Sequence, residues 1–231
     1  MLLVISFLLK EYPVSELQNI KLNFQKKEIT QENNDNNKEK IPQVAIICII
    51  LFAFFLNFDR MSDWIMEPYL VKKFGKTMFD NYFAFWIGIF YVLTIIGYLI
   101  NIILARKPKP LITYKILIIC FFIFALYWFL FPFLNPTLLI IAIGSVNLIA
   151  GVVYIQYINV FFISSQKTSI KLKSTFYQIL GAIYVFGSKI PIPLGLWLTN
   201  LLSKQMILFL CGIPMLICAI LLNYLKKYLK F

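Results

Sequence analysis

The residue whose chemistry is most informative is Lys189, which stands within the apolar stretch Gly187-Ser-Lys-Ile-Pro-Ile-Pro-Leu-Gly195. A charge in the middle of a membrane-spanning segment is costly, and it usually faces the protein interior or a water-filled cavity. The two prolines remove backbone donors and predict a helix break at the same depth. Because transporters often hold anionic groups with a cation beside a broken helix, Lys189 and Ser188 are candidate ligands of a small anionic solute. The alternative is that Lys189 extends its ammonium to a membrane interface.

A second set of small and polar residues repeats at helical spacing. Gly144, Asn147, Gly151 and Tyr154 are three or four residues apart and therefore share one helix face. The glycines predict close packing against another helix. Asn147 and Tyr154, with Gln156 on another face of the same segment, are further candidates for binding the solute.

Three carboxylates, Asp59, Asp63 and Glu67, follow the first apolar segment at intervals of four residues. If the helix continues past Phe58, all three share one face at the non-cytosolic mouth, where mutual repulsion favours the uptake of a proton. We interpret them as a candidate proton-sensing group, with a solvated loop cluster as the alternative.

Enzyme chemistry is not expected. The chain contains no His, and His-Glu-x-x-His, Gly-x-Ser-x-Gly and phosphate-binding glycine loops do not occur in it. We therefore predict no catalytic residue, no metal site and no cofactor. The basic runs alternate with apolar segments and belong to membrane topology, so nucleic acid is not an expected partner.

The elements that must position these residues are membrane helices. All ten acidic residues lie within the first 80 positions, whereas residues 81–231 are free of acids and strongly apolar. The chain is 61% hydrophobic, with a mean hydropathy of +0.81. A soluble protein cannot bury that much apolar surface, so the sequence predicts an integral membrane protein with the lipid bilayer as its first partner.

Six apolar segments reach the roughly 20 residues that a helix needs to cross a bilayer. They are residues 42–62, 82–104, 111–134, 137–163, 176–200 and 205–225. Only Asn135 and Pro136 separate the third from the fourth, which predicts a tight antiparallel hairpin. The predicted fold is an all-α membrane protein with a six-helix domain over residues 41–231.

Residues 1–40 differ in kind. Gln31–Lys40 is polar and of low complexity, which predicts a disordered linker. Met1–Leu9 is apolar but too short to span a membrane, and it is interpreted either as a signal peptide or as the end of a helix whose start is missing. A helix stump, a linker and six helices are typical of the second half of a twelve-helix transporter.

The positions of Lys and Arg predict the orientation. With a cytosolic N-terminus, fifteen of these residues fall on the cytosolic side and five on the other. The positive-inside rule therefore favours cytosolic placement of both termini.

Two short motifs resemble the battenin family. Leu148-Ile-Ala-Gly-Val-Val-Tyr-Ile-Gln156 is similar to the family's Gly-Gly-x-x-Tyr-Val-Asn stretch, with Gly151, Tyr154 and Gln156 as the matching positions. Phe54-Phe-Leu-Asn57 resembles an aromatic-rich segment that ends in Asn. Cys120 and Pro136 fall at similar spacing, so the resemblance covers about residues 42–202.

The resemblance also has departures. The family's acidic residues in the first and fourth helices of this half are not in register here, and its Ser-Arg-Ser run is missing. The resemblance implies a major-facilitator-like protein of lysosomal or vacuolar membranes, linked to lysosomal pH homeostasis and to the export of glycerophosphodiesters. The interpretation as half of a twelve-helix transporter adds an expected partner, either a missing N-terminal six-helix half or a second copy of this chain. The alternatives are another multi-span carrier, such as a nucleoside-type transporter, or a non-transporting membrane scaffold or truncated product.

Overall fold

The computed structural model of the chain describes residues 42–105, 110–168 and 172–229, and within these ranges the regular elements are helices. The predicted stump and linker over residues 1–40 lie outside the described residues. So do Arg106, Lys107, Lys109 and Lys171 of the predicted cytosolic loops.

The first helical run is longer than the sequence predicted. It consists of α3 (Gln43–Phe55), the 3-10 helix η1 (Phe58–Ser62) and α4 (Asp63–Phe74). Together they form a 32-residue stretch, Gln43–Phe74, that is long and apolar enough to cross a membrane. The predicted segment ended at residue 62, with the acids at its mouth, and the structure corrects this. Asp59 lies halfway along the run.

Four more helical runs have the length and hydropathy of membrane spans, namely Leu111–Phe133, Pro136–Gln166, Lys173–Leu198 and Lys204–Leu229. A shorter apolar stretch, Phe85–Asn101, lies within a sixth long helix. The protein is therefore a multi-pass helical membrane protein. The remaining elements are α5 (Lys76–Ala105), α6 (Pro110–Leu130), η2 (Phe131–Phe133), α7 (Pro136–Gln166), α8 (Lys173–Lys189), α9 (Pro191–Leu198), α10 (Lys204–Leu210) and α11 (Gly212–Leu229).

Two turns show how the sequence ends one helix and begins the next. Gly75 follows α4 with φ +82°, a conformation that suits glycine, and α5 begins at the next residue. Asn135 is extended and caps α7, since its side-chain oxygen accepts a 2.8 Å hydrogen bond from the Leu138 N–H. The predicted tight hairpin at Asn135-Pro136 is confirmed.

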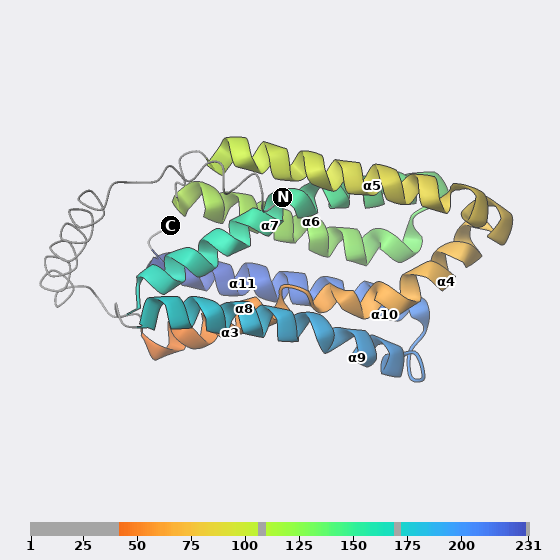
Figure 1. Ribbon diagram of the computed structural model, residues 1–231. Helices are drawn as coiled ribbons and strands as arrows, with labels where there is room; N and C mark the ends of the chain where they lie inside the picture. The colour runs from red at the N-terminus through yellow and green to blue at the C-terminus, as the bar shows by residue number, and fades with distance from the viewer. Residues whose placement is uncertain (1–41, 106–109, 169–171, 230–231) are drawn as a thin grey trace, which may run out of the picture. The chain divides into compact units, whose positions relative to one another are not determined.

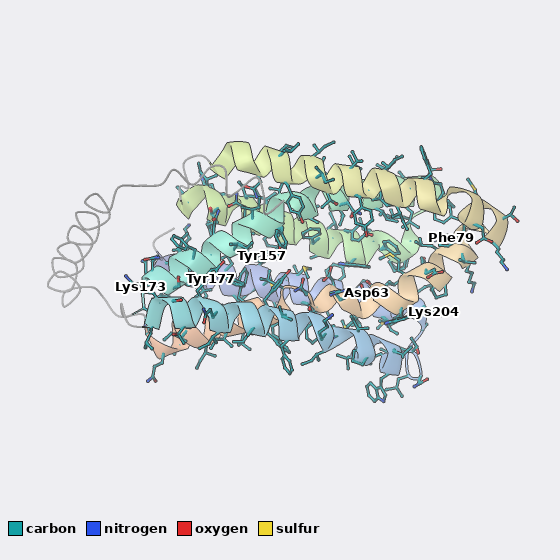
Figure 2. All side chains as sticks on the ribbon, viewed as in Figure 1. Asp63, Phe79, Tyr157, Lys173, Tyr177 and Lys204 are labelled. Carbon is teal, nitrogen blue, oxygen red and sulfur yellow. The ribbon has the colours of Figure 1, made fainter. Side chains whose placement is uncertain are left out.

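The helices of the described unit run side by side, with the start of α3 and the end of α11 at the same end of the bundle (Figure 1). Lys173 and Lys204 mark its opposite ends (Figure 2). Large apolar side chains such as Phe85, Tyr91 and Ile220 are 65–69% exposed on the outer face. That surface suits contact with lipid, because hydrocarbon solvates it as well as a protein core does.

We number six helical segments in chain order. Segment 1 is α3–η1–α4, segment 2 is α5, segment 3 is α6–η2, segment 4 is α7, segment 5 is α8–α9 and segment 6 is α10–α11. In the described part of the chain, segment 1 packs mainly against segments 2, 5 and 6. Segment 4 packs mainly against segments 5, 2 and 3, and segment 3 packs against segment 6. If segment 1 is exchanged with segment 4, segment 2 with segment 5 and segment 3 with segment 6, the same set of packing pairs results. The two halves of the unit therefore pack as equivalents.

Candidate functional site

A cavity of about 150 Å³ lies in the middle of the bundle. Its lining comes from segments 1, 3, 4, 5 and 6, each near the midpoint of its length. The lining residues are Leu56, Asn57, Asp59, Phe121, Phe124, Ala150, Val153, Tyr154, Tyr157, Tyr184 and Met215. Figure 2 places Tyr157 between the two ends that Lys173 and Lys204 mark.

The wall of the cavity on segment 1 is a helix break. Helix α3 ends at Phe55, and Asn57 has φ −115° and ψ 18° before the chain re-enters helical geometry in η1. Asn and Asp favour such breaks because their side chains compete with helical hydrogen bonds. Segment 5 approaches closely here: a Cβ at Gly187 would collide with the Phe54 carbonyl oxygen, and one at Gly195 with that of Met61. Glycine therefore brings segment 5 against the broken backbone.

Two polar side chains of the break face the cavity. Asn57 lines it, and its Nδ2 atom is buried without a hydrogen-bond partner in the described part of the chain. Asp59 also lines the cavity, and its side chain is partly buried. The neighbouring Arg60 forms its ion pair with another carboxylate, since its Nε lies 3.0 Å from Oδ2 of Asp63 in an exposed pair. Among the described residues Asp59 has no ion-pair partner.

Another part of the wall is a cluster of tyrosines. The hydroxyl of Tyr157 donates to that of Tyr184 over 2.7 Å, and their ring centroids are 4.9 Å apart. Tyr154 packs edge-on against Tyr157 at 5.2 Å and against Tyr98 at 5.6 Å. Because Tyr154 lines the cavity and is also 43% exposed, the cavity reaches the outer face of segment 4.

The predicted solute ligands of segment 5 lie away from this cavity. Lys189 is the last residue of α8, just before the predicted break at Pro191, and its side chain is exposed. It continues a stripe that includes Val185 and Phe186, which are 56% and 61% exposed. Ser188 is buried, and its hydroxyl donates to the Val185 carbonyl at 2.6 Å. The anion site at Lys189 stays a prediction that needs another surface to cover this stripe.

The predicted stripe of segment 4 packs on segment 2. Cβ atoms at Gly97 and Gly151 would collide with backbone oxygens of the facing helix, so the predicted close packing at Gly151 is confirmed. Asn147 lies 3.4 Å from the Thr94 hydroxyl, and Gln156 donates to Asn101 at 2.6 Å. Asn147 and Gln156 therefore belong to this helix contact. Of the five predicted solute ligands, only Tyr154 lines the cavity.

The three predicted proton-sensing acids have different surroundings in the structure. Asp59 lies in η1 and lines the cavity, whereas Asp63 begins α4 with an exposed side chain. Glu67 is exposed one turn further along α4. The expected α-helix past Phe58 is replaced by the 3-10 helix η1, which lies between the break at Asn57 and α4, so Asp59 is offset from the α-helical spacing that Asp63 and Glu67 keep. A proton-sensing role for these acids stays a prediction.

Sequence reasoning did not assign four residues to the cavity. Asn57 was noticed only through a motif, Asp59 was placed at a membrane mouth, and Tyr157 and Tyr184 were not singled out. One sequence feature could have placed Asp59 inside the first segment. The apolar residues around Ile65 and Leu70 extend that segment beyond Asp59.

The chemistry that the cavity offers is binding. One carboxylate, one unpartnered amide donor and a set of aromatic rings can hold a small molecule, and no group of three potential metal ligands occurs among the described residues. Comparison of the chain with known protein families, with curated proteins and with solved structures finds no match.

Proposed function

We propose that residues 41–231 form a six-helix unit of a secondary transporter of the major facilitator kind, with its solute site in the central cavity. The observation that carries the proposal is the packing pattern that is unchanged when segments 1–3 are exchanged for segments 4–6. Many secondary transporters are built from such internal repeats, and they bind solute near the membrane midplane beside interrupted helices. The break at Asn57 and the mid-length cavity agree with this design.

The resemblance to the battenin family gives independent support. Its two motifs are nearly a hundred residues apart in the sequence, yet Asn57 from one and Tyr154 from the other line the same cavity. A scaffold protein has no use for an unpaired carboxylate and an unpaired amide at this depth, since both cost stability. On the resemblance alone we also propose a lysosomal or vacuolar membrane. Because alternating access normally needs two bundles around a shared site, we propose a second six-helix half or a second copy as partner.

The transport role is tested by the accessibility of the cavity from the two sides of the membrane. In a chain whose cysteines at 48, 120, 211 and 218 have been replaced, the Ala150→Cys variant places a thiol on the cavity wall. We expect a membrane-impermeant thiol reagent to label it from either side, because a transporter opens its site alternately. The matched control, Asn200→Cys in the exposed turn after α9, reacts from one side only. Labelling of Ala150→Cys from a single side would exclude alternating access.

The proposed orientation has its own test. A glycosylation sequon engineered next to Lys73, near the end of α4, should be modified, because the split of fifteen to five basic residues puts this turn on the non-cytosolic side. An unmodified sequon in a membrane-inserted chain contradicts the orientation and leaves the packing pattern untouched.

A further inference from the structure

The charge of the cavity wall limits which solute it can hold. Of the lining residues that the structure describes, Asp59 alone carries a charge. The nearest arginine in sequence, Arg60, is engaged with Asp63, and Lys189 lies on an exposed stripe of segment 5. An anion in the cavity would meet an uncompensated carboxylate in a medium that screens poorly. A cation would supply the missing counter-charge.

The aromatic lining favours the same sign of charge. Phe121, Phe124, Tyr154, Tyr157 and Tyr184 all contribute to the wall. Aromatic faces carry negative electrostatic potential and attract ammonium groups, most strongly where water is excluded, and cages of aromatic residues are a recurrent means of binding quaternary ammonium ions.

The third feature is the donor of Asn57. Its buried Nδ2 atom has no partner, although every buried donor costs free energy until it finds an acceptor. A neutral oxygen on the solute, such as a hydroxyl, would accept this N–H. The cavity thus presents a carboxylate and aromatic rings for a cationic head and an amide for a neutral polar end.

We propose that the cavity binds a small organic cation that carries an ammonium or quaternary ammonium head and a neutral oxygen. The head lies against Asp59 and the tyrosines, and the oxygen accepts the Asn57 N–H. The volume of about 150 Å³ sets the size. Engineered protein cavities of about that volume hold a benzene-sized molecule, so a cation of the size of choline fits in this one. The assignment rests on the proposed transport function for its biological meaning, but the binding itself does not require transport.

The experiment is a binding titration of the purified full chain in lipid nanodiscs by calorimetry. The probes are choline, tetramethylammonium, which lacks the hydroxyl, and glycerol 3-phosphate as an anion of similar size. We expect saturable binding of both cations, tighter for choline, and none of glycerol 3-phosphate. Asp59→Asn keeps the shape and removes the charge, and it should weaken choline binding about thirtyfold or more. The matched control Glu67→Gln removes an exposed carboxylate of α4 and leaves the Arg60–Asp63 ion pair in place, so it should bind choline within about twofold of the unaltered chain.

Two further variants keep the test decisive if Asp59→Asn does not fold. Tyr184→Leu removes one ring of the cage and should weaken both cations about tenfold. Asn57→Leu should weaken choline and leave tetramethylammonium unchanged, because only choline offers an acceptor. Unaltered cation affinity in Asp59→Asn or in Tyr184→Leu, or a wild-type chain that binds glycerol 3-phosphate in preference to choline, would overturn the proposal.

The outcomes separate this inference from the transport role. A chain that binds choline in an Asp59-dependent way but labels from one side at Ala150→Cys is a cation-binding membrane protein and not a transporter. A chain that shows alternating access but binds neither cation keeps the transport role and refutes the cationic solute.

Discussion

Segment 2 packs on segment 4 and segment 5 packs on segment 1, and these two contacts are equivalents under the exchange of the halves. Both are built on glycines whose Cβ atoms would collide with a facing carbonyl, at Gly97 and Gly151 in one contact and at Gly187 and Gly195 in the other. Yet only the second contact contributes residues of both its segments to the central cavity. The approach of the backbones is the same, so the cause lies in what the helices carry at the point of contact.

In the contact of segments 2 and 4 both helices are continuous, and most polar groups find partners across it. The Asn101 side chain accepts from Gln156 and donates to the Val152 carbonyl, and Thr94 reaches Asn147. One acceptor, Oε1 of Gln156, is left without a partner in the described residues. Membrane helices use such small residues and side-chain hydrogen bonds for association. This contact holds the fold.

In the contact of segments 1 and 5 the helix of segment 1 is broken, and the polar side chains at this break line the central cavity. Asn57 has an unpartnered donor and Asp59 an unpaired carboxylate, and both line the cavity. Irregular backbone at membrane depth is tolerated where protein covers it or water fills a cavity. The comparison therefore assigns stability to one contact and ligand binding to its equivalent.

The largest expected effect breaks the packing that both contacts share. Gly97→Val places a branched side chain against the Leu148 carbonyl, and Gly187→Val does the same against that of Phe54. Because the obstacle is backbone, the helices must separate, and we expect each variant to lose about 3 kcal/mol or more of unfolding free energy. The measurement is reversible unfolding in detergent or nanodiscs.

The matched control for these variants is Gly181→Ala in α8, where a Cβ meets no atom within 4 Å. It should be neutral or gain about 0.5 kcal/mol from helix propensity. If Gly97→Val unfolds like the control, segments 2 and 4 do not approach as closely as described.

The second effect tests the polar side of the contact of segments 2 and 4. Asn101→Leu leaves the Gln156 amide donor without its partner, and we expect a loss of about 1–2 kcal/mol in unfolding free energy. In a double-mutant cycle with Gln156→Leu the coupling should be about 0.6 kcal/mol, the usual size for side-chain hydrogen bonds between membrane helices. Strict additivity of the two changes would show that the side chains do not interact.

Much of the fold could be predicted from hydropathy and turn chemistry. The segments around 111–134 and 137–163 appear within a few residues of their predicted bounds, because long apolar runs and the Asn135-Pro136 turn are local signals. The first segment was cut short because Asp59, Arg60 and Asp63 lower its local hydropathy. In the structure the break turns Asp59 inward, while Arg60 and Asp63 pair at the surface.

The site was harder to predict because it is made by tertiary packing. A glycine stripe shows that some helix packs closely, but it does not identify the partner, so Asn147 and Gln156 were assigned to a cavity and lie in a helix contact. Tyr157 and Tyr184 stand in apolar helices, where aromatic residues are ordinary. Only the fold brings their hydroxyls together. Lys189 was predicted to bind an anion because it lies in the middle of an apolar segment. That position does not determine whether its side chain faces the cavity or the outer surface.

The third effect has the opposite sign and sharpens the comparison. Asp59→Asn removes an unpaired carboxylate from the bundle, so we expect unfolding free energy to rise by about 1 kcal/mol while cation binding falls. The gain is modest because the side chain is partly accessible through the cavity. Asp63→Asn, which breaks only an exposed ion pair, should change unfolding free energy by less than about 0.5 kcal/mol. A destabilised, correctly inserted Asp59→Asn would show that the carboxylate is a structural group and not a binding one.

The smallest expected effect concerns the hydroxyl pair of the tyrosine wall. Tyr157→Phe removes the 2.7 Å hydrogen bond to Tyr184 and keeps both rings, so it should cost about 0.6 kcal/mol. Tyr91→Phe, an exposed position on α5, is the control and should be neutral. Because cation binding depends on the ring faces and not on this hydroxyl, Tyr157→Phe should bind tetramethylammonium within about twofold of the unaltered chain. A loss of tetramethylammonium binding in Tyr157→Phe would mean that the hydroxyl pair contacts the cation directly, and the cavity would then be a polar site with aromatic walls instead of an aromatic cage.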